Sequence, residues 1–134
     1  MSTGCIGQKI IEYEEKYETL IKPQDIVVLY TGHSQCYGQE EYFMEYPILT
    51  KEFAELLVRK QVKMIGLDTP SPDKYPFEVH KLLFQNNILI LENLTNVDRL
   101  LNMSHFEIMA LPMLIQADSA IARVVARIDL EART

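Results

Sequence analysis

Three short aliphatic runs, separated by segments with helical periodicity, constrain the fold of this chain more than any other feature. The runs are Ile26–Tyr30, Val62–Leu67 and Ile88–Leu91. Their branched residues and the turn residues around them are typical of buried strands. Strands joined by helical crossovers run parallel, so their carboxyl ends meet at one edge of a sheet. The sequence therefore predicts an α/β fold with a parallel portion of sheet.

Helices are predicted before, between and after these strands. Apolar residues recur three and four positions apart in an acidic segment that ends before Pro23, and again in a segment that Thr50 can cap. Pro76 is placed to open a third helix, because a proline at the first helical position loses no hydrogen bond. The expected helices are Gln8–Lys22, a helix from Thr50 to Lys60, Pro76–Gln85 and Thr95–Leu101.

Two further strands are predicted near the C-terminus, over His105–Ile115 with an interruption at Pro112 and over Ile121–Ile128. The second shows the clearest alternation of inward and outward residues, and the two could pair antiparallel. The sheet would then be mixed, with flanking helices. A chain of 134 residues has the size of one domain, so we expect a single α/β domain over residues 1–134. Residues 32–47 are expected to form a long polar and aromatic loop.

The charge balance argues against two classes of partner. The chain has 13 Lys and Arg against 19 Asp and Glu, which gives a formal net charge of −6. Nucleic acids and anionic membrane surfaces call for a positive patch, so we expect neither. No apolar run approaches the roughly 20 residues of a membrane span, and no secretory leader is expected. Two cysteines, Cys5 and Cys36, make no disulfide framework, which favours a reduced, cytoplasmic setting.

Polar residues follow each of the three strands at the edge where open α/β sheets bind ligands. They are His33, Asp68 and Glu92. Glu92 directly follows four large aliphatic residues, so we expect it to be partly buried and therefore protonated, paired or bound to metal. A role as a helix cap or salt-bridge partner is the alternative, and spacing alone favours that alternative.

His80 lies on the third predicted helix, between Phe77 and Phe84, on a face expected to point inward. Only Asn86-Asn87 joins this helix to the following strand, so His80 and Glu92 are expected to pack together. A histidine and a carboxylate in one pocket could bind a metal or move a proton. The alternative is a core histidine that bonds to the backbone. Tyr37, Tyr42 and Phe43 could form a substrate wall, an oligomer contact or a packed cluster.

Four segments together resemble the cyclase family of metal-dependent hydrolases, which includes bacterial kynurenine formamidases and isatin hydrolases. The segments are 21–32, Gly66-Leu67-Asp68-Thr69-Pro70-Ser71-Pro72-Asp73, Val79-His80-Lys81-Leu82-Leu83 and Ile88-Leu89-Ile90-Leu91-Glu92-Asn93-Leu94. Their order and spacing match the family from about residue 11 to 128. Two departures are His33, where many relatives carry Trp, and Gln24 in place of Gly.

The resemblance implies a swivelling β/β/α fold, assembly as a homo-oligomer (dimer or tetramer), and hydrolysis of a small amide or lactam substrate with zinc or manganese. It implies that Glu92 is a metal ligand and that His80 is a metal ligand or an acid–base group. The loop from Thr31 to Phe43, including His33, Tyr37 and Tyr42, would line the substrate pocket together with Asp68.

The family's principal metal motif, His-x-Gly-Thr-His-x-Asp-x-Pro-x-x-His, is absent upstream of these segments. We therefore expect the chain to correspond to the C-terminal portion of such an enzyme, as a fragment, as one product of a split gene with an upstream-encoded N-terminal half, or as a degenerate homologue. With two ligands, metal binding and hydrolysis by the chain alone are expected to be weak or absent. The alternative function is a non-catalytic, oligomeric interaction or ligand-binding module derived from the same fold.

Overall fold

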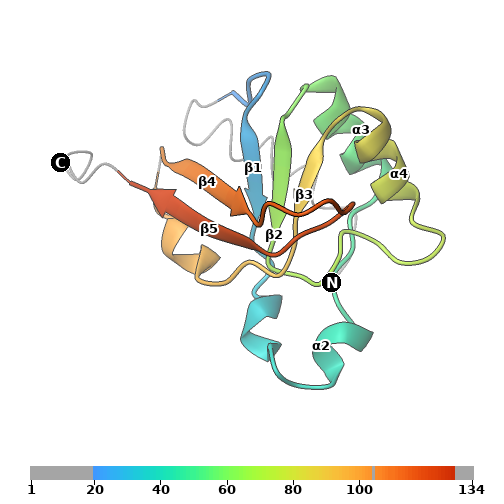
Figure 1. Ribbon diagram of the computed structural model, residues 1–134, viewed down its shortest axis with the longest axis vertical. Coiled ribbons are helices and arrows are strands. Elements are labelled where there is room, and N and C mark those ends of the chain that lie inside the picture. Colours follow the sequence, from blue (N-terminus) through green and yellow to red (C-terminus); the bar gives the residue numbers. More distant parts are fainter. Residues whose placement is uncertain (1–19, 104, 129–134) are drawn as a thin grey trace. The chain divides into compact units, whose positions relative to one another are not determined.

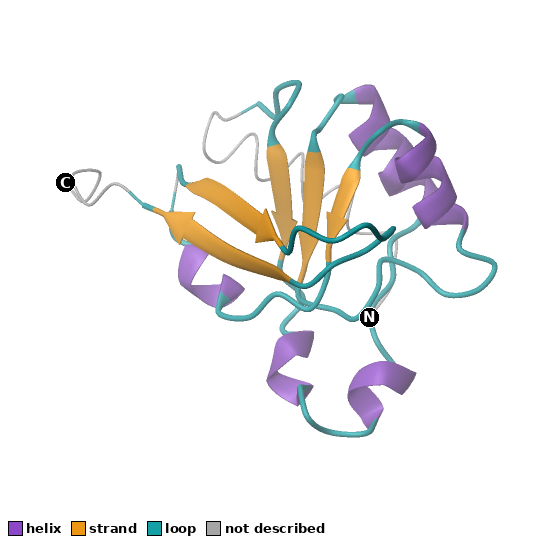
Figure 2. Cartoon of the chain, viewed as in Figure 1, coloured by secondary structure: helices purple, strands orange, loops and turns teal. Residues whose placement is uncertain are grey.

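The computed structural model describes residues 20–103 and 105–128. The chain divides into two compact units, one ending at Asp98 and the other beginning at Arg99. The first unit holds a parallel sheet with its helices, and the second holds an antiparallel hairpin (Figures 1 and 2). The expectation of one domain over residues 1–134 stays a prediction.

The first unit is built on three parallel strands, β1 (Ile26–Leu29), β2 (Met64–Leu67) and β3 (Leu89–Leu91), in the order β1-β2-β3. Gly66 at the centre pairs with Val28 on one side and Leu91 on the other. The carboxyl ends of the strands therefore lie at one edge of the sheet. This confirms the parallel arrangement predicted from the three aliphatic runs, and each strand is one or two residues shorter than its run.

Helices α3 (Lys51–Arg59) and α4 (Glu78–Gln85) pack with this sheet to form the core. As predicted, Thr50 caps α3, because its hydroxyl accepts a hydrogen bond from the Phe53 amide at 3.2 Å. The buried core consists of Leu49, Phe53, Ala54, Leu57, Val62, Ile65, Leu67, Val79, Leu83 and Ile88. Both helices are amphipathic, and the face that carries their buried apolar residues packs into this core.

The predicted start of the third helix is wrong. The helix begins at Glu78, and its N-cap is Phe77, whose backbone is left-handed with φ 61°. Pro76 therefore lies before the helix, because the left-handed residue after it breaks the helical path. The expected inward face is also wrong, since Phe77 and Phe84 are exposed. The α4 residues that reach the core are Val79 and Leu83.

Other predicted segments differ in detail. The expected loop over 32–47 contains a 3-10 helix, η2 (His33–Cys36), and a short helix, α2 (Glu41–Met44). The expected helix over 95–101 is a 3-10 turn, η3 (Val97–Leu100). The helix expected over Gln8–Lys22 lies outside the described residues except for 20–22, which are not helical. In the described ranges no helix combines the length and apolar character that crossing a membrane requires.

The second unit contains β4 (Glu107–Pro112) and β5 (Ala122–Arg127), which pair antiparallel from Glu107 opposite Arg127 to Pro112 opposite Ala122. An exposed ion pair joins Glu107 to Arg127 at 2.6 Å. The predicted antiparallel pairing is confirmed, and the first strand ends at Pro112 instead of resuming after it. The α/β class with parallel and antiparallel strands is also confirmed. In residues 20–103 and 105–128 the two kinds of pairing form separate sheets.

Candidate functional site

The carboxyl ends of β1 and β2 are joined by the side chain of Asp68, which follows β2. One carboxylate oxygen accepts hydrogen bonds from the amide and hydroxyl of Thr31, at 2.9 and 2.7 Å. The other accepts from the amide of Gly32 at 2.8 Å. Asp68 is fully buried, so these donors offset the cost of removing its charge from water. Asp68, expected in the substrate pocket, lies here as the group that fixes the chain after β1.

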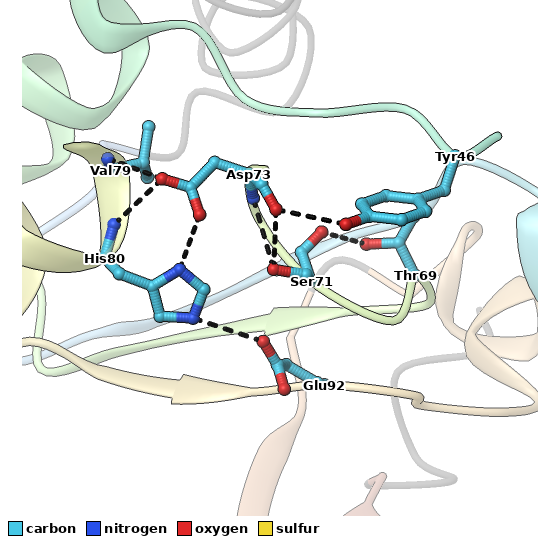
Figure 3. Close-up of polar contacts among 7 residues, drawn as sticks. All are labelled: Tyr46, Thr69, Ser71, Asp73, Val79, His80 and Glu92. Carbon is cyan, nitrogen blue, oxygen red and sulfur yellow. Dashed lines mark hydrogen bonds and ion pairs between the residues drawn. The ribbon is translucent and has the colours of Figure 1, made fainter. Parts of the chain in front are cut away.

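A short hydrogen-bonded turn carries the chain from Asp68 toward α4. The Thr69 hydroxyl donates to the Ser71 carbonyl at 3.0 Å, and the Ser71 hydroxyl donates to the Asp73 carbonyl at 2.8 Å (Figure 3). The Tyr46 hydroxyl donates to the same Asp73 carbonyl at 3.1 Å. These bonds give the turn a defined path, so the Asp73 side chain reaches the first turn of α4.

Asp73 caps α4 from outside the helix. The N-cap residue Phe77 offers no side-chain acceptor, and the Asp73 carboxylate accepts instead from the amide of Val79 at 2.7 Å and from that of His80 at 3.3 Å. These amides belong to the second and third helical positions, the donors that an N-cap side chain normally satisfies. The carboxylate also lies at the positive end of the helix dipole, where a negative charge is favoured.

The imidazole of His80 lies between two carboxylates. Its Nδ1 is 2.5 Å from Asp73 Oδ1, and its Nε2 is 3.4 Å from Glu92 Oε1 (Figure 3). The side chains of His80 and Glu92 are 24% and 33% exposed, whereas that of Asp73 is 7% exposed. The structure thus brings His80 and Glu92 together at an edge that solvent reaches, with Asp73 behind them.

Glu92 is held at this edge by the backbone that follows β3. The amide of Asn93 donates to the Thr69 carbonyl at 2.9 Å, and the amide of Leu94 donates to the Leu67 carbonyl at 2.9 Å. Partial burial raises the pKa of Glu92, while the nearby His80 acts in the opposite direction. A carboxyl that is partly desolvated next to an imidazole can hold a proton or a cation.

The side chains of this site could supply some, but not all, of the ligands of a divalent metal. An imidazole nitrogen and a carboxylate oxygen are ligands that Zn²⁺ accepts, and Mn²⁺ accepts carboxylates readily. A ligating histidine commonly donates its other N–H to a carboxylate, and Asp73 lies where that partner is needed. In the part of the chain that the structure describes, no group of three or more His, Cys, Asp or Glu side chains is arranged to hold a metal ion. His80 and Glu92 therefore fit as two ligands of a larger set.

The aromatic residues expected to line a pocket form a cluster around Tyr42, which is 1% exposed. His33 stacks on the Tyr42 ring with centroids 4.9 Å apart, and its Nε2 lies 2.9 Å from the Tyr42 carbonyl oxygen. Tyr37 and Phe43 meet the same ring edge-on, and both are exposed. The Tyr42 hydroxyl donates to Asn93 Oδ1 at 2.8 Å, so the cluster is attached next to Glu92.

Sequence reasoning did not single out Asp73 or the aromatic residues beside His80 as part of the site. Phe77 and Phe84 meet the imidazole edge-on, each with centroids 5.7 Å from it. A signal for Asp73 was present, because an acidic residue that closes a proline-rich turn shortly before a helix is a capping candidate. The exposure of the two phenylalanine rings could not be found from helical spacing, which predicted a buried face.

The sequence matches the family described as putative cyclase over residues 3–74, and His80 and Glu92 lie beyond this match. An uncharacterized protein of Methanocaldococcus jannaschii is 36% identical over 104 residues, which are 76% of this chain and 53% of the relative. Kynurenine formamidases of Bacillus cytotoxicus and Bordetella avium are 38% and 31% identical, over 60% and 78% of this chain and 40% and 50% of their own lengths. The chain spans about half the length of these relatives or less.

Two solved structures share the fold. An isatin hydrolase bound to the product analogue thioisatinate has a TM-score of 0.74 at 21% identity, covering 89% of this chain and 50% of that one. A protein described as a potential metal-dependent hydrolase with cyclase activity has a TM-score of 0.63 at 26% identity, covering 80% and 52%. These likenesses confirm the predicted cyclase-like fold class.

Proposed function

Because the chain belongs to the cyclase family of hydrolases, we propose that it forms part of a metal-dependent hydrolase that cleaves an amide or lactam bond in a small molecule. The names of its relatives support this class, since they include kynurenine formamidases and an isatin hydrolase. The observation that carries the proposal is the pair formed by His80 Nε2 and Glu92 Oε1, 3.4 Å apart, with Asp73 bonded to the opposite nitrogen of the imidazole.

In this proposal His80 and Glu92 would hold a zinc or manganese ion through Nε2 and a carboxylate oxygen. When bound, such an ion supplies a Lewis acid that polarises the carbonyl to be cleaved. Two ligands are fewer than the three that a catalytic zinc site usually takes from protein. The remaining ligands would come from an upstream-encoded segment or from a second copy in a homo-oligomer.

The residues of this chain also have chemistry of their own to supply. His80 is the candidate for moving a proton if its Nε2 is not occupied by metal, and its partly buried neighbour Glu92 could share that proton. The rings of Phe77 and Phe84 both pack against the imidazole by edge-to-face contact. The enzyme is proposed to work in the cytoplasm, as the low cysteine content favours.

Titration calorimetry with Zn²⁺ and with Mn²⁺ tests the proposed metal ligands. If the two-ligand site is already formed, the wild-type chain binds one ion weakly but saturably, and His80→Gln and Glu92→Gln each weaken binding by roughly tenfold or more. His105→Gln is the matched control, because it removes an exposed histidine of the second unit and should leave binding unchanged. No saturable binding by wild type, or equal binding by all the proteins, would mean that this chain on its own is not an enzyme and would favour a non-catalytic module.

Hydrolysis is measured with an N-aryl formamide and with isatin. Weak turnover is expected from the metal-loaded chain alone, and stronger turnover after the upstream segment that carries the family's metal motif is added. In that complete enzyme, His80→Ala and Glu92→Ala should each lower the rate by orders of magnitude, because each removes a ligand or a proton carrier. Rates close to wild type in both variants would reject the assignment.

A further inference from the structure

The Asp73 carboxylate serves two partners with its two oxygens. Oδ2 accepts from the amides of Val79 and His80 at the start of α4, while Oδ1 lies 2.5 Å from His80 Nδ1. We infer that Asp73 is a positioning residue, which fixes the neutral imidazole of His80 with its proton on Nδ1 and so presents the Nε2 lone pair toward Glu92. This inference rests on the proposed function, because it concerns how His80 is presented to a ligand.

The proton assignment follows from which groups can donate. Backbone amides only donate, so Oδ2 must accept from them, and an ionised carboxylate has no proton to offer at Oδ1. His80 Nδ1 must therefore be the donor in this contact. A neutral imidazole carries one proton, so Nε2 is left with its lone pair. Asp73 is almost fully buried, so water does not compete for either oxygen.

His33 provides an internal reference with the opposite tautomer. Its Nε2 lies 2.9 Å from the carbonyl oxygen of Tyr42. A carbonyl oxygen only accepts, so His33 must carry its proton on Nε2. The chain contains three histidines, and two of them are thus expected to hold opposite tautomers within one unit of the fold.

Replacing Asp73 with Asn separates the two roles of the carboxylate, which caps α4 with one oxygen and contacts His80 Nδ1 with the other. An amide side chain has one accepting oxygen and one donating nitrogen. The oxygen is required at the helix amides, which cannot accept, so the NH₂ group turns toward His80 Nδ1. Nδ1 must then accept and the proton must move to Nε2. Asp73→Asn should therefore keep the cap of α4 and reverse the tautomer of His80.

Long-range ¹H–¹⁵N NMR of the imidazole rings reads the tautomers directly, in metal-free protein at a pH of about 8.5, two units above the ordinary histidine pKa. In wild type we expect Nδ1–H for His80 and Nε2–H for His33, with the His80 signals assigned by their loss in His80→Gln. In Asp73→Asn, His80 should switch to Nε2–H while His33 keeps its pattern. A wild-type His80 with Nε2–H or with both protons, or an Asp73→Asn variant that keeps Nδ1–H, would overturn the inference.

Two further variants separate positioning from general disturbance of the helix. Glu78→Gln removes an exposed carboxylate from the same first turn of α4 and should leave the His80 tautomer unchanged. Asp73→Ser removes both carboxylate oxygens, and its hydroxyl lies one bond short of the positions from which they reach His80 and the helix amides, so His80 should lose its Nδ1–H preference even if Asp73→Asn fails to fold. A retained preference in Asp73→Ser would also overturn the inference.

The tautomer measurement needs neither metal nor turnover, so its failure is distinct from that of the proposed function. If the tautomers are as expected but calorimetry finds no metal, Asp73 still positions His80 and the proposal that this chain alone binds a metal falls. If metal binds but the wild-type tautomer is Nε2–H, the hydrolase proposal stands and the role of Asp73 falls. When both hold, Asp73→Asn should also weaken metal binding, because Nε2 then carries a proton.

Discussion

Tyr42 shows how one side chain attaches a long segment to the candidate site. Its ring is buried among His33, Tyr37 and Phe43, and its hydroxyl donates to Asn93, the residue after Glu92. Burial raises the pKa of the Tyr42 phenol, and the charge of Asp68 adds to the effect. The hydrogen bond to Asn93 requires the phenol to keep its proton, so the native contact and the raised pKa favour the same protonation state.

Alkaline titration tests this account of Tyr42. Its pKa is higher in the folded protein than in the unfolded chain, so the stability it contributes is fully present below the ordinary tyrosine pKa of about 10 and is lost as the pH rises through the folded-state value. Absorbance titration of phenolate should show one tyrosine that ionises after the exposed ones. Tyr42→Phe should remove that late step, and Tyr37→Phe should not. A late step that persists in Tyr42→Phe would contradict the assignment.

At the scale of elements, α3 and α4 end with the same backbone motif, and each is followed directly by a strand of the parallel sheet. In α3 the amide of Val62 donates to the Leu57 carbonyl at 3.3 Å and that of Gln61 to the Val58 carbonyl at 2.9 Å. In α4 Ile88 and Asn87 make the equivalent bonds, both with the pattern of a Schellman motif. Gln61 and Asn87 are left-handed, with φ 55° and 58°. The buried Val62 and Ile88 then lead into β2 and β3.

Gln61→Gly is expected to stabilise the protein. A left-handed glutamine costs roughly 1–2 kcal/mol, and glycine removes this cost. Because glycine also has more conformational freedom in the unfolded chain, part of the gain is lost. The free energy of unfolding should therefore rise by about 0.5–1 kcal/mol. Chemical denaturation monitored by circular dichroism measures the change. Asn87→Gly is the matched control and should gain less, because asparagine tolerates this conformation. A loss of stability in Gln61→Gly would contradict the claim that the left-handed backbone of Gln61 is strained.

At the scale of the whole molecule, the second unit exposes several large apolar side chains at one end of its hairpin. They are Leu111, Met113, Leu114, Ile115 and Ile121, and Leu114 is fully exposed. Large apolar side chains that stay exposed in one stretch of the chain are candidates for an interaction site. Its presence supports the proposal that the chain works as a homo-oligomer.

Light scattering over a range of concentrations tests self-association. The wild-type chain is expected to form a dimer or larger oligomer, and a Leu114→Ser, Ile121→Ser double variant is expected to shift toward monomer, because it removes apolar area from the hairpin end. Glu107→Gln, which breaks only the exposed ion pair with Arg127, should leave the oligomeric state unchanged. A wild type that stays monomeric at every concentration would argue against oligomerisation through this hairpin.

The sequence by itself determined the parallel strands, the antiparallel hairpin, the Thr50 cap and the helix end at Asn86-Asn87. It could do so because strand and helix periodicity, capping and turn chemistry act over a few residues. The placement of Glu92 at the carboxyl end of β3 follows from the same local rules. The short link between α4 and β3 was enough to predict that His80 and Glu92 lie together.

Only the tertiary structure decided what surrounds that pair. The turn that carries Asp73 is held by Tyr46, and Asp68 is held by Thr31 and Gly32, which donate to it from the segment after β1. Such contacts join residues distant along the chain, so they form only when the whole unit closes. The left-handed Phe77, which shifts the start of α4 and exposes a face predicted to be buried, does not follow from helical spacing.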